Sequence, residues 1–182
     1  MKLLGICGLA RSGKDSFYNL SKPIIESKNE SHLRLAFADA LKEELDDLLM
    51  RNTGISAFTD EDSKKEIIRP LLVTYGTHVR RKLDKDCWIK RLDMAVRYSL
   101  DHNQWVFITD VRYDNEIDWV HGIGGKSVHV TREGNVAPNQ EELDNDPTLK
   151  DKSDFHISWK DFELENMEEI SNKVNNVLSS IT

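Results

Sequence analysis

A short glycine-rich segment carries the strongest chemical signal in this chain. Residues 8–16 read Gly-Leu-Ala-Arg-Ser-Gly-Lys-Asp-Ser, which fits the pattern G-x-x-x-x-G-K between an apolar run and a helix-like segment. In that context glycines let the backbone wrap a phosphate, while N–H groups and a helix N-terminus attract its charge. Lys14 would then contact the β- and γ-phosphates of a nucleotide. The alternative is a turn with a solvated lysine, and the surrounding pattern favours the phosphate-binding loop.

The end of this loop predicts a magnesium ligand. Asp15 follows Lys14, and a hydroxyl comes one residue later at Ser16, a K-x-S ending that resembles the nucleoside monophosphate kinases. Ser16 is therefore the candidate Mg²⁺ ligand, directly or through water. Asp15 either lies near the ion without binding it directly or is a carboxylate favoured by the helix dipole, and the sequence leaves both open.

Four basic residues in the middle of the chain, Lys42, Arg69, Arg80 and Arg81, could hold a second anion. A small kinase needs such cations when its acceptor already carries a phosphate, because two anions must be brought together. The chain has no N/T-K-x-D motif for reading guanine, which argues against a GTPase. Arg80 by itself is expected on a solvated helix face. Arg69 stands beside Pro70 and twelve residues before Arg81, a spacing that a folded helix pair would bring to one side.

A carboxylate follows the most apolar segment of the chain, residues 105–109. Asp110 is expected at the carboxyl edge of a sheet, facing the ligand crevice. There it would orient the magnesium shell or the attacking group, and the alternative is an ordinary turn residue. Arg112 and Glu116 are expected to form a local ion pair or to reach the ligand. Trp88 is either a core residue or a surface on which a base stacks.

These residues require a framework of strands and helices. Strand-like and helix-like segments alternate, which predicts one α/β domain over residues 1–182 with a mainly parallel five-stranded sheet. The predicted strands are 2–7, 32–38, 105–109, 126–131 and 162–164. The predicted helices are about 13–28, 39–52, 63–83 with a break or a new start at Pro70, 86–102, 115–120 and 167–181.

Residues 133–155 are predicted to form a loop or lid. Gly134, Pro138 and Pro147 punctuate a stretch dense in Asn, Asp and Glu, a composition typical of loops. Closure of this segment over a nucleotide would exclude water and suppress wasteful hydrolysis.

Composition argues against several other classes of function. The chain has 182 residues and a formal net charge of −7, a balance poorly suited to duplex DNA. No apolar run approaches the roughly 20 residues that span a bilayer, and the apolar N-terminal stretch is too short for a secretion signal. We therefore expect no nucleic acid or membrane partner and a cytoplasmic location. Cys7 and Cys87 are expected as buried thiols, and no Cys/His cluster has the spacing of a zinc site.

Five blocks of sequence, in order, resemble one family of kinases. They are Gly-x-x-x-Ser-Gly-Lys-Asp-Ser at 8–16, Phe-Ala-Asp-Ala-Leu-Lys at 37–42, Arg-Pro-Leu-Leu-Val-Thr-Tyr-Gly-Thr at 69–77, Asp-x-Asp-x-Trp at 84–88 and Thr-Asp-Val-Arg-x-x-x-Glu at 109–116. Together they resemble the bacteriophage deoxynucleoside monophosphate kinases, from about residue 2 to residue 132 and more weakly to the end.

The resemblance implies a fold and an activity. The fold is the nucleotide-kinase type of P-loop NTPase, with a parallel sheet and helices on both faces. The activity is transfer of the γ-phosphate of ATP, with Mg²⁺, to a deoxynucleoside 5′-monophosphate. A homodimer, an acceptor-binding helical region at about 39–104 and, for a phage-encoded chain, the host cytoplasm are also implied. The alternatives are a kinase of another phosphorylated metabolite, of the phosphomevalonate or dephospho-coenzyme A type, and a non-catalytic nucleotide-binding module.

Carried over by position, the resemblance also implies sets of site residues. The ATP-binding set is Arg11, Ser12, Gly13, Lys14, Asp15, Ser16 and Arg132. The acceptor-binding set is Ala10, Asp39, Lys42, Arg69, Gly76, Thr77, Arg81, Trp88, Asp110 and Arg112. The catalytic set is Lys14, Arg69, Arg81, Asp110 and Arg132. Ser16 would hold the magnesium ion, with Asp15 and Asp110 acting on it more distantly.

Overall fold

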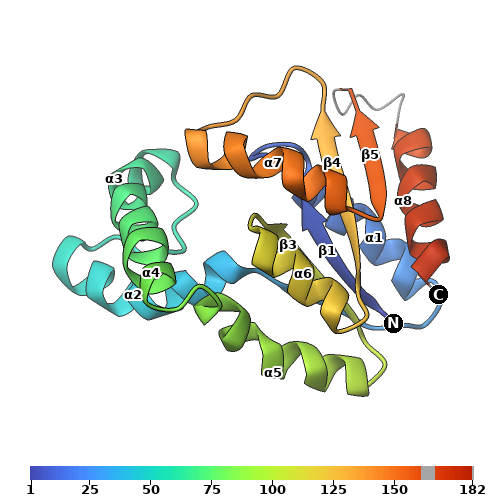
Figure 1. The fold of residues 1–182 in the computed structure, drawn as a ribbon, viewed down its shortest axis with the longest axis horizontal. Coiled ribbons are helices and arrows are strands. Elements are labelled where there is room, and N and C mark those ends of the chain that lie inside the picture. Colours follow the sequence, from blue (N-terminus) through green and yellow to red (C-terminus); the bar gives the residue numbers. More distant parts are fainter. Residues whose placement is uncertain (161–166, 182) are drawn as a thin grey trace. The chain divides into compact units, whose positions relative to one another are not determined.

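The computed structural model describes residues 1–160 and 167–181, and its centre is one sheet of five parallel strands (Figure 1). The spatial order of the strands is β2-β3-β1-β4-β5. Their bounds are β1 (Leu3–Cys7), β2 (His32–Leu35), β3 (Trp105–Val111), β4 (Lys126–Arg132) and β5 (Phe155–Trp159). The predicted α/β class and five-stranded parallel sheet are confirmed.

The chain divides into two compact units, residues 1–35 with 95–182 and residues 36–94. The first unit holds the sheet and four helices, α1 (Lys14–Glu26), α6 (Asp114–Gly122), α7 (Gln140–Lys152) and α8 (Met167–Ile181). The second holds α2 (Phe37–Thr53), α3 (Asp62–Val73), the π-helix η1 (Thr74–Arg80) and α4 (Arg81–Leu83). The division falls within α5 (Cys87–Asp101).

Helices cover both faces of the sheet because successive side chains of β1 point to opposite sides. Leu4 and Ile6 belong to a core that includes residues of α1 and α8, two helices that lie side by side (Figure 1). Gly5 faces the other side, where an added Cβ would lie 3.3 Å from Val120 of α6. Every residue of β1 is buried, as expected of a central parallel strand.

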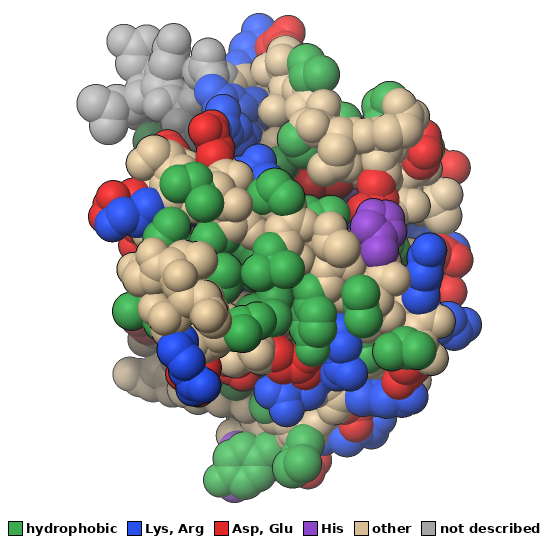
Figure 2. Space-filling model, turned by 90° about the vertical axis from the view of Figure 1, so that its left-hand side faces the viewer, with side chains coloured by type: hydrophobic (Ala, Val, Ile, Leu, Met, Phe, Trp, Pro, Cys, Tyr) green, Lys and Arg blue, Asp and Glu red, His purple; other side chains and the backbone are tan. Residues whose placement is uncertain are grey.

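The second unit has a smaller core and exposes several apolar side chains. Leu45 and Leu49 of α2 pack with Ile68 of α3 and with Ala57 between these helices. On the face that Figure 2 turns to the viewer, hydrophobic side chains gather near the centre. The large exposed apolar residues of this unit include Leu48, Met50, Phe58, Ile67, Leu71, Val73, Val79 and Leu83.

The helix that begins at Asp62 does not break at Pro70. Pro70 lies inside α3, and the backbone stays helical through Thr74 and Arg80 into α4. The predicted break, and the folded helix pair that would place Arg69 beside Arg81, are therefore wrong. An interior proline removes one backbone hydrogen bond, and here the run continues through the wider turns of a π-helix. Twelve residues along such a run correspond to roughly 15–18 Å.

Segment 133–155 is mostly helical, so the prediction of a loop there is wrong. Its helix α7 begins after Asn139, whose side-chain oxygen accepts the Glu142 N–H at 2.8 Å. Pro147 lies inside α7. An asparagine three residues before a glutamate is an N-cap pattern, and this signal outweighs the loop-like composition.

Two strand predictions also need correction. The second strand ends at Leu35, because α2 already begins at Phe37 and buries its aromatic ring. The fifth strand is β5, in which Phe155, Ile157 and Trp159 alternate with more exposed residues. The predicted strand 162–164 lies outside the described residues.

Two further properties bear on the predicted class of protein. No helix among the described residues is both long and apolar enough to cross a bilayer. Cys7 and Cys87 are buried free thiols, as predicted. Burial raises the pKa of Cys7 to about 12, which makes this thiol unreactive.

Candidate functional site

Four parallel strands of the first unit end at the same edge of the sheet, and the predicted site residues follow them. The glycine-rich loop follows β1, Asp110 lies near the end of β3, and Arg132 closes β4. Trp159 closes β5. The carboxyl edge of a parallel sheet is where such folds bind ligands.

The loop between β1 and α1 contains three residues with positive φ, namely Gly8, Arg11 and Gly13. Gly8 has φ +127° and Gly13, the N-cap of α1, has φ +97°. A Cβ at Gly8 would overlap the carbonyl oxygen of Val130 in β4, and one at Gly13 would lie 2.7 Å from Nε1 of Trp159. The loop therefore approaches its neighbours more closely than any side chain permits.

Trp159 fixes the loop to β5. Its indole N–H donates to the carbonyl oxygen of Ser12 at 2.8 Å, and this bond is buried. The Ser12 hydroxyl is also buried and has no hydrogen-bond partner among the described residues. Such an unsatisfied polar atom is costly in a finished core and is common where a ligand completes the site.

Lys14 lies at the centre of the loop and is only 9% exposed. Its Nζ donates to the carbonyl oxygens of Gly8 and Leu9, both at 2.7 Å. Burial lowers the pKa of Lys14 to about 8, and the charge of Arg112 adds to this effect. The charges of Glu142, Asp110 and Asp15 oppose it. Asp110 and Arg112 therefore lie close enough to Lys14 for their charges to act on it.

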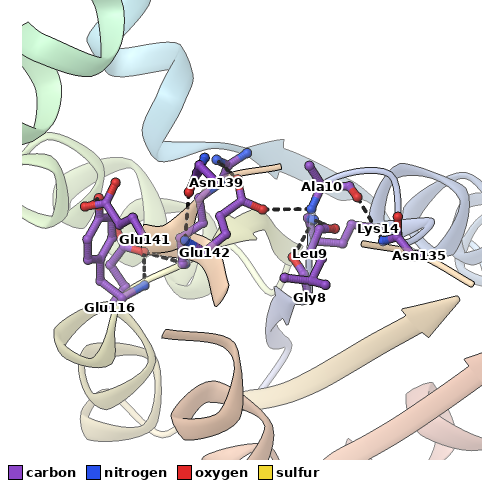
Figure 3. Close-up of polar contacts among 11 residues, drawn as sticks. Gly8, Leu9, Ala10, Lys14, Glu116, Asn135, Asn139, Glu141 and Glu142 are labelled. Atoms are coloured by element: carbon purple, nitrogen blue, oxygen red, sulfur yellow. Dashed lines mark hydrogen bonds and ion pairs between the residues drawn. The ribbon is translucent and has the colours of Figure 1, made fainter. Parts of the chain in front are cut away.

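A glutamate that the sequence analysis missed lies on this loop (Figure 3). Glu142 of α7 accepts the Ala10 N–H at 2.8 Å through one carboxylate oxygen. Its other oxygen accepts Nη1 of Arg112 at 2.7 Å. The Asn135 side chain donates to the Ala10 carbonyl oxygen at 2.9 Å. The N-cap pattern before Glu142 could have predicted the helix, but no local signal predicts a contact across 132 residues.

A buried carboxylate shapes the turn after β3. Glu116 is 1% exposed and accepts the backbone N–H groups of Arg112 and Tyr113 at 2.8 and 3.1 Å. The predicted ion pair between Arg112 and Glu116 is therefore wrong, because the guanidinium group bonds Glu142 instead. Glu116 positions the turn and leaves the arginine side chain directed at the loop.

The remaining donor-side residues lie at the rim of this edge. Asp15 is 79% exposed and lies 3.8 Å from the Arg34 guanidinium. Ser16 is half-buried in the first turn of α1, and Arg11 is exposed. Arg132 lines a cavity of about 790 Å³ at the carboxyl ends of β4 and β5. The other residues that line it include both bases and acids: Thr131, Glu133, Lys150, Ser158, Trp159, Lys160, Glu169, Ile170 and Lys173.

The predicted acceptor residues are divided between the two units. Ala10, Asp110 and Arg112 belong to the first unit, and the second holds Asp39, Lys42, Arg69, Gly76, Thr77, Arg81 and Trp88. Lys42 lies 3.6 Å from Asp39, and its Nζ is 5.4 Å from the centre of the Phe58 ring. Gly76 is buried in η1, where an added Cβ would lie 2.9 Å from Leu41. Arg69 is exposed on α3, whereas Arg81 and Thr77 are half-buried.

Arg80 is not on a solvated helix face, contrary to the prediction. Its guanidinium group donates to Glu44 at 3.1 Å and lies 5.5 Å from the ring centre of Trp88. Tyr75 donates to the other oxygen of Glu44 at 3.0 Å. Trp88 is only 2% exposed, as the core interpretation predicts.

Comparisons with known proteins agree with this architecture. Residues 47–174 match the family model described as deoxynucleotide monophosphate kinase. Dephospho-CoA kinase from Campylobacter jejuni superposes with a TM-score of 0.57 at 11% identity, covering 99% of this chain and 96% of that chain. A Thermus thermophilus protein gives a TM-score of 0.47 at 14% identity, covering 99% and 97%. No curated protein matches the sequence. At 11% identity the likeness to dephospho-CoA kinase shows the fold alone.

Proposed function

This chain belongs to the deoxynucleotide monophosphate kinase family and is an ATP-dependent nucleotide kinase, and from that premise we propose which residues perform the transfer. The loop of residues 8–16, with Asp110, Arg112 and Arg132, forms the donor and transfer site of the first unit. The cations of the second unit bind the deoxynucleotide acceptor. Dephospho-coenzyme A remains an alternative acceptor at the level of the fold.

The observation that carries the donor assignment is the state of Lys14. The ammonium group of Lys14 is buried and donates to two carbonyl oxygens of its own loop. These neutral acceptors balance its positive charge poorly, because burial disfavours a charged group. A polyphosphate in the loop would supply the missing negative charge. The unpartnered Ser12 hydroxyl and the N-terminus of α1 would add polar contacts to the same anion.

The cavity beside Arg132 is the proposed binding place for the nucleoside part of ATP. Its volume of about 790 Å³ falls in the range of nucleotide-sized pockets. Trp159 connects the cavity to the loop, because it lines the cavity and its indole N–H also donates to the carbonyl oxygen of Ser12. We propose that the nucleoside part of ATP enters this cavity and that Arg132 contacts its phosphates.

The side-chain oxygen atoms near the loop are of the kind that binds magnesium. Mg²⁺ in kinases is held by one or two protein oxygens together with substrate phosphates, and no three His, Cys, Asp or Glu side chains gather as a metal cage in the described part of the chain. Ser16, in the first turn of α1, would hold the ion, and Asp110 would orient its waters. The bound ion would neutralise charge on the phosphates.

Phosphoryl transfer between two phosphates depends on placement and charge neutralisation more than on covalent help. The acceptor phosphate is already anionic, so no general base is required. Lys14 and Arg112 lie where they can stabilise charge on the transferred group, and Glu116 holds the backbone turn that aims Arg112. Arg69 and Arg81 would each contact the acceptor nucleotide, at separate positions, because the continuous helical run keeps them apart.

Transfer to an acceptor is the direct test of this function. With γ-labelled ATP, we expect labelled dTDP or dGDP from dTMP or dGMP. We expect no labelled product from phosphomevalonate or dephospho-coenzyme A. Label transfer only to a non-nucleotide would overturn the acceptor assignment, and ATP binding without any phosphorylated product would support a non-catalytic module.

Arg69→Ala and Arg81→Ala are expected to weaken acceptor use selectively. Loss of a charged hydrogen bond to the nucleotide costs about 1.5–3 kcal/mol, so each variant should raise the KM for the deoxynucleotide roughly tenfold or more. The KM for ATP should change by about twofold or less. Steady-state kinetics measures both values. Arg51→Ala, an exposed arginine on α2 of the same unit, is the matched control, and equal effects in all three variants would contradict the assignment.

ATP binding is expected to weaken at alkaline pH because of Lys14. Its pKa of about 8 in the free protein lies below the ordinary value of a lysine, and bound phosphate favours the charged form. Affinity is therefore complete below pH 8 and is lost as the pH rises above it. The dissociation constant should be about tenfold higher at pH 9 than at pH 7. Calorimetry measures this change, which should be absent in Lys14→Met.

The homodimer and the cytoplasmic location implied by the family resemblance stay predictions. The exposed apolar residues of the second unit offer a surface that a second copy could cover. Sedimentation at several protein concentrations would measure whether the protein forms a dimer.

A further inference from the structure

We propose that Glu142 is an internal ligand of the phosphate-binding loop, which occupies the Ala10 N–H in the free protein and is displaced when a polyphosphate binds. Glu142 would then set the affinity of the enzyme for its donor. This inference rests on the proposed function of the loop as the ATP site. It names Glu142 as a residue that competes with ATP for that loop.

Both oxygens of the Glu142 carboxylate are engaged on the ligand side of the loop. One accepts the Ala10 N–H and the other accepts the Arg112 guanidinium group (Figure 3). The side chain is 11% exposed, so solvent screens its charge only in part. A carboxylate with a backbone amide and an arginine on its two oxygens reproduces the surroundings that the loop would give a phosphate.

A phosphate in the loop and the Glu142 carboxylate cannot both keep these positions at low cost. Two negative charges held a few ångströms apart repel each other strongly where solvent screens them only in part. They would also compete for the same donors, the Ala10 N–H and Arg112. Binding of the polyphosphate therefore requires the carboxylate to leave. The free energy of the hydrogen bonds that Glu142 loses then makes the free energy of ATP binding less favourable.

The contact also couples the loop to the first turn of α7. Asn139 caps this turn, and the neighbouring Glu141 accepts the Tyr113 hydroxyl at 2.8 Å. Asn135, just before the helix, donates to the Ala10 carbonyl oxygen. Residues 135–142 thus bond both the N–H and the C=O of Ala10, and release of Glu142 would remove one of these two attachments.

Glu142→Gln tests the proposal because it keeps the shape of the side chain and removes its charge. Glutamine has only one acceptor oxygen and no charge, so it can hold the Ala10 N–H or Arg112 but not both, and ATP should displace it more easily. We expect the dissociation constant for ATP, measured by calorimetry without acceptor, to fall about tenfold. Glu141→Gln is the matched control, because this neighbour bonds Tyr113 instead of the loop, and its dissociation constant should stay within about twofold of the unmodified chain.

The outcomes separate this inference from the proposed function. If the unmodified chain binds ATP and Glu142→Gln binds it equally well or more weakly, Glu142 only positions Arg112 and the inference fails. If Lys14→Met binds ATP as tightly as the unmodified chain, the proposed donor site itself is wrong.

Hydrogen exchange of the unmodified chain provides a second measurement that requires no variant. Amides of residues 139–146 should exchange faster with saturating ATP than without it, because the displaced carboxylate no longer holds the first turn of α7. Unchanged or slower exchange in this segment would overturn the proposal even if Glu142→Gln did not fold.

Discussion

Lys14→Met is expected to fold and to lose at least about 100-fold in kcat/KM for phosphoryl transfer. Loss of a charged contact to the transferred group costs about 3 kcal/mol or more, and each 1.36 kcal/mol corresponds to a factor of ten. Methionine fills the same buried channel with an unbranched chain. It also removes a charge that burial disfavours, as the pKa of about 8 for Lys14 indicates, so the fold should not lose stability. A coupled assay of ADP release measures the activity, and thermal unfolding measures the stability.

Lys22→Met is the matched control for this prediction. Lys22 also lies on α1, where its ammonium group is 5.4 Å from the centre of the Tyr18 ring and outside the loop. We expect this variant to retain kcat/KM within about twofold of the unmodified chain. A folded Lys14→Met variant with the activity of Lys22→Met would show that the loop does not hold the transferred phosphate.

Gly8→Ala is expected to lower the free energy of unfolding by about 3 kcal/mol or more. Its Cβ would overlap the Val130 carbonyl oxygen, and its φ of +127° lies in a region that alanine rarely adopts. Val130 belongs to the neighbouring strand β4, whose backbone bonds β1 and β5, so it cannot shift freely. For a chain of this size about 3 kcal/mol corresponds to a melting temperature roughly 6–12 °C lower. Calorimetry of thermal unfolding measures the change.

Gly134→Ala separates the two causes of this destabilisation. Gly134 has φ +74°, but an added Cβ there meets nothing within 4 Å. This variant therefore carries the conformational strain without the overlap and should cost about 1–2 kcal/mol. If Gly8→Ala is no less stable than Gly134→Ala, the loop is not held against β4 as the structure indicates.

The phosphate-binding loop and the sheet class could be predicted because their signals are local or periodic. A glycine at each end of the loop, a lysine after the second and an apolar run before the first specify the turn wherever the segment lies. Asp110 and Arg112 could be placed near Lys14 by one topological rule, since parallel strands end at a common edge. In the structure the charges of both residues act on the pKa of Lys14, and their roles in the site stay predictions.

The incorrect predictions concern segments that were judged from their composition or from a single proline. Pro70 and Pro147 both lie inside helices, because tertiary packing and the rest of the helix outweigh one missing backbone bond. Arg80 looked solvated because helical periodicity does not show that Glu44 and Trp88 surround it. The register of a helix places a side chain on one face, but the neighbouring element decides whether that face meets water.

By itself the amino-acid sequence determined that this chain has a glycine-rich loop between a buried strand and a helix, and it predicted the kinase family that the comparison shows. Those features depend on backbone freedom at glycine and on residues adjacent in the chain. Only the tertiary structure decided that Trp159 and Glu142 bond this loop from 147 and 132 residues away. Such contacts depend on how parallel strands and their following helices are ordered across the sheet, and no local pattern encodes that order.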